Sequence, residues 1–201
     1  MRLVPTLLPA IALCGWLTPA ALAVSVPSPS NSYVDPCLRV CPGGDMSFRV
    51  VVRDFIGFPI ANAIVTVDFC QCPEVRLCPV TGHEPYQVLF GCAVVAVTQA
   101  NGEVVFPIQA GGLCPNFDAR VIADGVLLAT RAVASPDQDG NLNVSNFDGG
   151  LLSAKLGGPF DPTADLDCDG ALSPNDLAAL QQHLGTGASR PRRWCDRAGE
   201  G

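Results

Sequence analysis

Two acidic stretches with the same spacing lie 28 residues apart near the carboxyl end, and they restrict the fold more than any other feature of the sequence. In residues 165–176, acidic side chains occupy positions 1, 3, 5 and 12, and glycine occupies position 6. Calcium takes about six to eight oxygen ligands at about 2.3–2.6 Å, and alternate side chains of a tightly turning loop converge on one such ion. Glycine permits the sharp turn. The spacing therefore predicts a calcium-binding loop.

The ligands of this second loop follow position by position. They are four carboxylates and one backbone carbonyl, from Asp165, Asp167, Asp169, Ala171 (the carbonyl) and Asp176. A water near Ser173 would complete the shell. Loops of this kind usually end in a bidentate glutamate, so the shorter Asp176 indicates fewer oxygen ligands or a tighter loop. The alternative interpretation is an acidic surface turn without a metal.

Residues 137–148 repeat the pattern, and internal repetition supports both assignments. The predicted ligands of this first loop are Asp137, Asp139, Asn141, Asn143 and Asp148. Leu142 stands at position 6, where a left-handed backbone would cost about 1 kcal/mol or more. We therefore expect one strong Ca2+ site in the second loop and a weaker or empty site in the first. A register shifted by two residues would put Gly140 at position 6, but it would break the repeat of the leucines that follow.

A short helix is predicted after each loop. Ser145 and Ser173 stand where an N-cap belongs, an aspartate follows three residues later in each copy, and Pro174 suits the first helical turn. Leu152 and Leu180 recur at the same offset. The duplicated unit is therefore a calcium loop followed by one helix, which is an EF-hand without its incoming helix.

Two such loop-helix units resemble the dockerin family of secreted bacterial proteins, over residues 135–185. In that family the duplicated calcium-bound segment forms a small helical module that docks onto cohesin domains of a scaffold, often in assemblies that degrade polysaccharides. The resemblance implies a dockerin-like module in residues 135–201 and a protein partner. It also assigns partner recognition to loop positions 10 and 11, which here are Asn146, Phe147, Pro174 and Asn175.

The amino end predicts export. Residues 1–23 have a basic start, an apolar run and the small-residue cleavage pattern of a signal peptide, so Val24 is the predicted mature start. A membrane anchor is the alternative, but prolines and glycine interrupt the run, and no other stretch is long and apolar enough to span a bilayer. We expect a secreted or cell-surface protein whose residues 24–44, with Cys37 and Cys41, form a flexible leader.

Nine cysteines follow the signal peptide, and in an exported chain they are disulfide candidates. They are Cys37, Cys41, Cys70, Cys72, Cys78, Cys92, Cys114, Cys168 and Cys195. Because nine is odd, one thiol is left over. We expect Cys168 to pair with Cys195, which would tie the second loop to the chain end. A thiolate metal site at positions 70, 72 and 78 is disfavoured because the paired CxxC spacing is missing.

Residues 45–134 alternate apolar and polar side chains in short runs, which predicts half-buried strands. One inward face holds Phe48, Val50 and Val52, and Asn101-Gly102 and Asp124-Gly125 indicate tight turns between neighbouring strands. Six or seven strands in this length indicate a β-sandwich. The segments 49–54, 61–67 and 98–106 resemble bacterial immunoglobulin-like domains of adhesins. The fold class expected is mainly β, an immunoglobulin-like β-sandwich followed by a small α module.

No set of side chains in the sequence forms a recognisable catalytic site, so we expect a protein that is not an enzyme. The net charge of −7 argues against general nucleic-acid binding. We expect calcium-dependent attachment to a protein partner, cohesin-like or a surface scaffold, with the sandwich as spacer or ligand-binding head. Two alternatives stay open: an accessory component of extracellular polysaccharide catabolism that binds the polysaccharide, and a purely structural calcium site.

Overall fold

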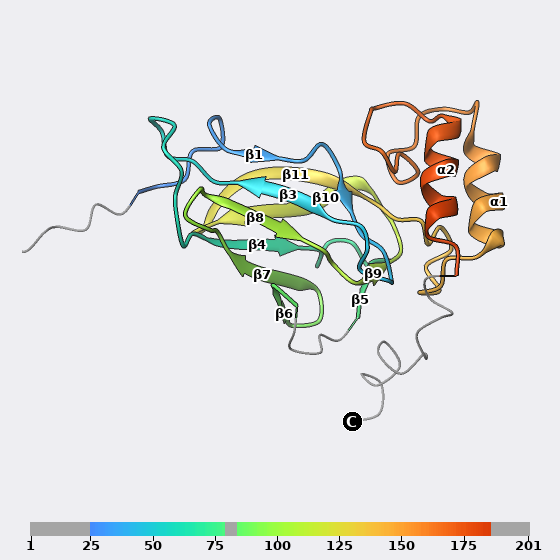
Figure 1. The fold of residues 1–201 in the computed structure, drawn as a ribbon, viewed down its shortest axis with the longest axis horizontal. Coiled ribbons are helices and arrows are strands. Elements are labelled where there is room, and N and C mark those ends of the chain that lie inside the picture. Colours follow the sequence, from blue (N-terminus) through green and yellow to red (C-terminus); the bar gives the residue numbers. More distant parts are fainter. Residues whose placement is uncertain (1–24, 79–83, 186–201) are drawn as a thin grey trace, which may run out of the picture.

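The computed structural model describes residues 25–78 and 84–185, which form two β-sheets, a small two-stranded sheet and two helices (Figure 1). The described chain is therefore mainly β, as expected. We call residues 25–134 the β region and residues 135–185 the helical region. Within the described residues, no helix is long and apolar enough to cross a membrane.

The β region is built from two sheets. In the three-stranded sheet the spatial order is β1 (Tyr33–Val34), β3 (Phe48–Val51) and β8 (Glu103–Phe106). In the six-stranded sheet the order is β2 (Leu38–Arg39), β11 (Val126–Ala134), β10 (Cys114–Ala123), β4 (Ile64–Asp68), β7 (Ala93–Val97) and β6 (Gln87–Leu89). A separate pair consists of β5 (Arg76–Leu77) and β9 (Ala110–Gly111).

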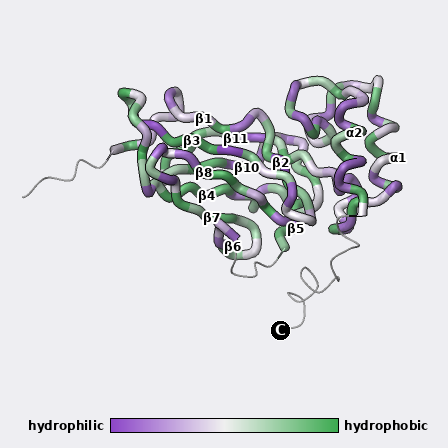
Figure 2. The backbone as a smooth tube through the Cα atoms, in the orientation of Figure 1, coloured by the Kyte–Doolittle hydropathy of each residue, from purple (hydrophilic) through white to green (hydrophobic). Residues whose placement is uncertain are grey.

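The two large sheets share one hydrophobic core, which contains the inward face predicted from alternation. Phe48 and Val50 of β3 are buried while Arg49 between them is exposed, and Val65 and Val67 of β4 are fully buried. The rings of Phe48 and Phe106 stack with their centroids 5.3 Å apart. Figure 2 shows the resulting pattern, with hydrophobic residues running along the central strands.

One of the two expected tight turns joins neighbouring strands and the other does not. Asp124 and Gly125 connect β10 to its antiparallel partner β11, and both have positive φ (44° and 81°). Asn101 and Gly102 lie instead between β7 and β8, which belong to different sheets. A Cβ on Gly102 would lie 2.5 Å from the carbonyl oxygen of Val52, which follows β3. This glycine therefore lets the chain pass close to β3 as it leaves the six-stranded sheet and enters the three-stranded sheet.

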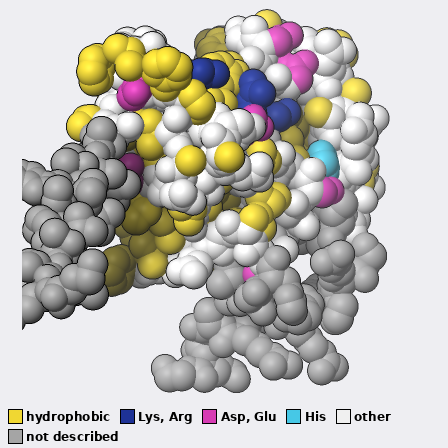
Figure 3. All heavy atoms as spheres, turned by 60° about the vertical axis from the view of Figure 1, so that its left-hand side comes forward, with side chains coloured by type: hydrophobic (Ala, Val, Ile, Leu, Met, Phe, Trp, Pro, Cys, Tyr) yellow, Lys and Arg dark blue, Asp and Glu magenta, His cyan; other side chains and the backbone are white. Residues whose placement is uncertain are grey.

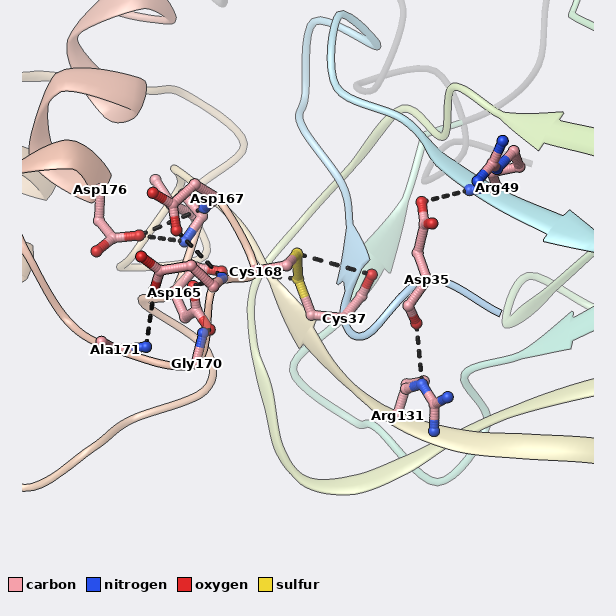
Figure 4. Close-up of a disulfide and its surroundings, with 12 residues drawn as sticks. Asp35, Cys37, Arg49, Arg131, Asp165, Asp167, Cys168, Gly170, Ala171 and Asp176 are labelled. Atoms are coloured by element: carbon pink, nitrogen blue, oxygen red, sulfur yellow. Dashed lines mark hydrogen bonds between the residues drawn. A yellow bond between two sulfur atoms is a disulfide. The ribbon is translucent and has the colours of Figure 1, made fainter. Parts of the chain in front are cut away.

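The leader differs from the flexible segment expected, because residues 25–44 add strands to both sheets. β1 pairs with β3, and β2 pairs in parallel with β11. Asp35 fixes the segment between these strands, since its side chain accepts the backbone N–H of Arg49 at 2.7 Å and its carbonyl accepts Arg131 Nε at 2.9 Å (Figure 4). Alternation in two-residue strands is too short to be recognised in a sequence, which explains the difference.

Three disulfides join described cysteines: Cys37–Cys168, Cys70–Cys92 and Cys72–Cys114. Cys78 is disulfide-bonded as well. The expected pairing of Cys168 with Cys195 is wrong, because Cys168 is bonded to Cys37, 131 residues earlier. Cys195 itself lies outside the described residues. Several disulfides are typical of proteins that fold in an oxidising compartment.

The helical region packs α1 (Asn146–Lys155) beside α2 (Pro174–Gln182) at one end of the molecule (Figure 1). A second hydrophobic core joins it to the β region. Its helical-region members are Val144, Leu152, Ala164, Leu166 and Leu180, and its β-region members are Cys37, Cys41, Met46 and Ala134. Since both regions contribute to this core, the boundary expected at residue 135 is a packed junction.

Candidate metal centre

Each helix follows directly after one of the acidic loops. The last aspartate of each loop also lies in the first turn of the helix that follows. Ser145 caps α1 and Ser173 caps α2, as predicted, and both form a capping box with the aspartate three residues later. The backbone N–H of Ser173 donates to Asp176 Oδ2 at 2.8 Å, and Ser145 donates to Asp148 Oδ2 at the same distance. The last residue of each loop therefore fixes the start of its helix.

In the second loop, backbone amides hold two carboxylates in place. Asp165 accepts the N–H of Asp169 on Oδ1 at 3.1 Å and the N–H of Gly170 on Oδ2 at 3.0 Å. Asp176 Oδ1 accepts the N–H of Leu166 at 2.8 Å. Figure 4 shows these carboxylates gathered with Asp167 beside the Cys37–Cys168 disulfide.

The first loop repeats these hydrogen bonds at equivalent positions. Asp137 accepts the N–H of Asn141 at 3.1 Å and that of Leu142 at 2.9 Å, and Asp148 Oδ1 accepts the N–H of Gln138 at 2.8 Å. The equivalence holds only in the expected register, because a shift by two residues would break every pair.

Backbone dihedrals support the same register. Position 6 is left-handed in both loops, with φ of 66° at Leu142 and 85° at Gly170, and position 4 is left-handed as well, at Gly140 and Cys168. Leu142 thus adopts the conformation usually reserved for glycine, at a cost of about 1 kcal/mol or more. The loop fold is therefore retained although its sequence disfavours it at this position.

Each loop brings three carboxylates together in a cluster that could hold a metal ion. The clusters are Asp137, Asp139 and Asp148 in the first loop and Asp165, Asp167 and Asp176 in the second, and in each the ligand atoms lie within 4.8 Å of one another. Asp137, Asp148 and Asp176 are fully buried, and Asp165 is only 4% exposed. Like charges this close and this buried repel one another unless a cation or a proton lies between them.

Burial and the neighbouring carboxylates raise the pKa of the carboxyl group at position 1 of each loop. Burial raises the pKa of Asp137 to about 6, with further raising contributions from neighbouring Asp139 and Asp148, while the N–H of Leu142 acts to lower it. Burial likewise raises the pKa of Asp165, and the charges of Asp176 and Asp167 add to the effect. A bound cation would remove this penalty on the charged form.

The other predicted ligands lie outside the two clusters. Asp169 Oδ1 accepts the N–H of Ala171 at 2.8 Å, and Asn141 Nδ2 donates to Asp139 Oδ2 at 2.7 Å. Asn143 and Ala171 are exposed at position 7, from which the backbone carbonyl is the expected ligand. The structure therefore assembles positions 1, 3 and 12, and leaves positions 5 and 7 at the rim.

The residues present fit calcium better than a softer metal. Both clusters offer only carboxylate oxygen, with amide or carbonyl oxygens next to them, and no nitrogen or sulfur ligand atom belongs to either. Hard oxygen ligands suit Ca2+ or Mg2+, and softer metals prefer nitrogen and sulfur ligands.

Two contacts that the sequence analysis missed hold the loops against the β region. A Cβ on Gly111 of β9 would lie 2.0 Å from Asp137 Oδ2 and 2.9 Å from Leu142 Cδ2, so the first loop lies directly on this glycine. Cys37 of the leader holds the second loop through Cys168. The Gly111-Gly112 pair was a visible signal of close backbone approach, whereas no local pattern indicated the partner of Cys37.

The positions assigned to partner recognition by the dockerin resemblance lie in the first turns of the two helices. Asn146 and Phe147 begin α1, and Pro174 and Asn175 begin α2. Phe147 is 63% exposed. A groove of about 210 Å³ runs between the helices, lined in part by small residues of α1.

The fold and the loops together define a class: a mainly β, disulfide-linked protein with a duplicated acidic loop-helix unit. Comparisons with protein-family models, with curated proteins and with solved structures found no match for the chain.

Proposed function

We propose that the chain is an exported, non-catalytic attachment protein whose loop-helix unit binds Ca2+ and docks onto a protein partner or the cell surface. The β region serves as spacer or ligand-binding head. One observation carries the proposal, namely that backbone amides hold the buried carboxylates at positions 1 and 12 of both acidic loops through equivalent hydrogen bonds.

Calcium would be held at positions 1, 3 and 12 of each loop, completed by positions 5 and 7. In the second loop these are Asp165, Asp167 and Asp176 with Asp169 and the carbonyl of Ala171, and in the first loop Asp137, Asp139 and Asp148 with Asn141 and Asn143. The ion supplies positive charge that neutralises the clustered carboxylates. Because Asp148 and Asp176 also cap the helices, an occupied loop orders the first turn of the helix that follows.

The helix pair is the surface that suits docking. It lies at one end of the molecule, away from the loop that joins β3 to β4 (Figure 1). The side chain of Phe147 on α1 is exposed to solvent. The dockerin resemblance supports a cohesin-like or other scaffold protein as partner. Loop positions 10 and 11 differ between the two copies, so the two helices would present different contacts to that partner.

Calorimetric titration of the mature chain with Ca2+, disulfides intact, tests the first step. We expect two sites, with the tighter one lost in Asp165→Ala and the weaker one lost in Asp137→Ala. Capture of surface proteins from the producing cell, in calcium and in chelator, then tests docking, and Phe147→Ala should reduce the calcium-dependent fraction. Absence of binding down to millimolar affinity, the weak end for extracellular calcium modules, would overturn the calcium step.

A purely structural calcium role is favoured by the contacts of both loops with the β region. Asp137 lies on Gly111, and Cys168 is bonded to Cys37. Under this alternative, calcium raises the melting temperature of the whole chain, but no partner is retained more strongly in calcium than in chelator. The two experiments above therefore distinguish it from docking.

Polysaccharide binding is favoured by a different observation, a cluster of exposed apolar side chains in the loop between β3 and β4. Phe55, Ile56 and Phe58 are 76%, 63% and 64% exposed, and Figure 3 shows hydrophobic side chains gathered at this end of the molecule. Asp54 Oδ1 accepts the N–H groups of Ile56 and Phe58, which holds the loop in one shape. Retention of the chain on insoluble polysaccharide, lost in Phe55→Ala/Phe58→Ala, would support this role, and no retention would exclude it.

A further inference from the structure

A second kind of cluster that could hold a metal ion lies at the junction of the two regions, and it shares no residue with the two acidic clusters. Cys41 follows β2 and pairs as a parallel bridge with Gln109, Asp45 follows four residues later, and His183 is the C-cap of α2. The ligand atoms of these three side chains all lie within 4.8 Å of one another. Asp45 and His183 are 138 residues apart, so only the packing of the helical region on the leader creates this cluster.

The three side chains already contact one another through polar atoms. His183 Nδ1 and Asp45 Oδ2 are 2.7 Å apart, and the Asp45 carboxylate also has a hydrogen bond with the Cys41 thiol. Tetrahedral bonds of about 2.0–2.3 Å place neighbouring ligand atoms about 3.3–3.6 Å apart. A small widening of the existing contacts would therefore admit an ion between the three groups.

The chemistry of this set differs from that of the loops. It offers one sulfur, one imidazole nitrogen and one carboxylate oxygen, where the loops offer oxygen only. Thiolate and imidazole ligands select zinc and similar transition metals, and calcium does not use them. One protein would thus hold two classes of ion at separate places.

Burial and access also suit an ion. Cys41 is fully buried, and burial shields its sulfur from oxidation and from exchange with other cysteines. The side chains of His183 and Asp45 are 14% and 41% exposed. The partial exposure of Asp45 leaves the cluster in contact with solvent on that side.

We propose that Cys41, Asp45 and His183 form a three-ligand site for Zn2+ that joins the end of α2 to the leader. Binding replaces the thiol proton, which passes to solvent, by the metal. Cys41 is fixed by its backbone, since its carbonyl accepts the N–H of Ala110 at 3.3 Å. The bound ion would thus hold the end of α2 against the leader, independently of calcium and in addition to the Cys37–Cys168 disulfide.

Cobalt absorption spectroscopy on the full mature chain, disulfides intact and with saturating Ca2+, tests the site. We expect one Co2+ per chain with the strong visible bands of a tetrahedral site and a thiolate-to-cobalt charge-transfer band, both removed by one equivalent of Zn2+. Cys41→Ser should abolish the charge-transfer band. His183→Gln should weaken Zn2+ binding at least 10-fold, whereas His83→Gln, at the other histidine of the chain, should leave it unchanged.

Two outcomes would overturn the proposal. One is a wild-type spectrum without a charge-transfer band, which decides the question even if Cys41→Ser fails to fold. The other is a band that persists in Cys41→Ser. In either case the three side chains form only a hydrogen-bonded contact, and the calcium proposal is unaffected because its titration uses a different ion and different residues.

Discussion

The first and second acidic loops have equivalent hydrogen bonds at positions 1 and 12 but are held to the β region in different ways. The first loop packs on Gly111 and carries a leucine at its left-handed position 6. The second carries Gly170 there and is joined covalently to the leader through Cys168. The comparison teaches that the carboxylate cage does not depend on glycine at position 6, provided that the tertiary contacts of the loop are close enough to hold a strained residue.

Removing the covalent link of the second loop should have the largest effect. In the chain-entropy model, a disulfide closing 131 residues contributes about 5 kcal/mol, and one closing 22 residues about 3 kcal/mol. We expect Cys37→Ala/Cys168→Ala to lower both the free energy of unfolding and the Ca2+ affinity of the second loop. Cys70→Ala/Cys92→Ala should lower stability only. Denaturant titration with calorimetry checks both, and equal loss of affinity in the two variants would contradict the distinction.

Crowding the packed contact of the first loop should come next. In Gly111→Ala the new methyl group meets Asp137 Oδ2 and Leu142 Cδ2, which should cost about 1–3 kcal/mol and weaken the first site about 10-fold or more. The second site should be unaffected. Gly150→Ala is the matched control, because nothing lies within 4 Å of its Cβ and a helical alanine is favoured over glycine by about 0.5–1 kcal/mol. Calcium titration of both variants provides the measurement.

Exchanging the residues at position 6 should give a smaller and symmetric effect. Leu142→Gly removes about 1 kcal/mol of backbone strain, so the first site should bind Ca2+ about five times more tightly. Gly170→Leu introduces the same strain in the second loop and should weaken that site by a similar factor. If Gly170→Leu abolishes binding altogether, the tertiary contacts of the second loop do not support a strained residue as those of the first loop do.

Removing the ion pair at the end of α1 should have the smallest effect on the free energy of unfolding. Lys155 in the last turn of α1 forms an ion pair with Asp161 at 2.8 Å, whereas α2 has no basic residue in its last turn. Burial acts to raise the pKa of Asp161, but hydrogen bonds with Lys155 and Thr163 outweigh it and leave the pKa lowered. The stabilisation is thus present above the unfolded-state pKa, about 3.9, and is lost as the pH falls through the lower folded value.

Thermal unfolding between pH 2 and 6 measures this contribution in chelator, where calcium does not contribute. The wild type should lose more stability on acidification than Asp161→Asn, because the variant has no carboxylate to protonate at this position. Parallel curves for the two proteins would show that the Lys155 pair contributes nothing.

Local patterns predicted the loops, their register and the helix caps, because all of these depend on residues within twelve positions of one another. The mainly β character and the inward face of β3 followed from alternation in the same way. The partner of Cys168, the strands of the leader and the contact at Gly111 could not be predicted, because each joins segments that only the folded chain brings together. The cluster of Cys41, Asp45 and His183 was missed for the same reason, since its members lie up to 142 positions apart in the sequence.

The link between Cys37 and Cys168 makes most of the described chain a closed ring. A single cut by a protease anywhere between these two cysteines would open the ring without separating its ends. The helical region would stay attached to the leader, and the cleaved protein would remain a single covalent molecule, whereas the same cut in a chain without this disulfide would give two separate chains.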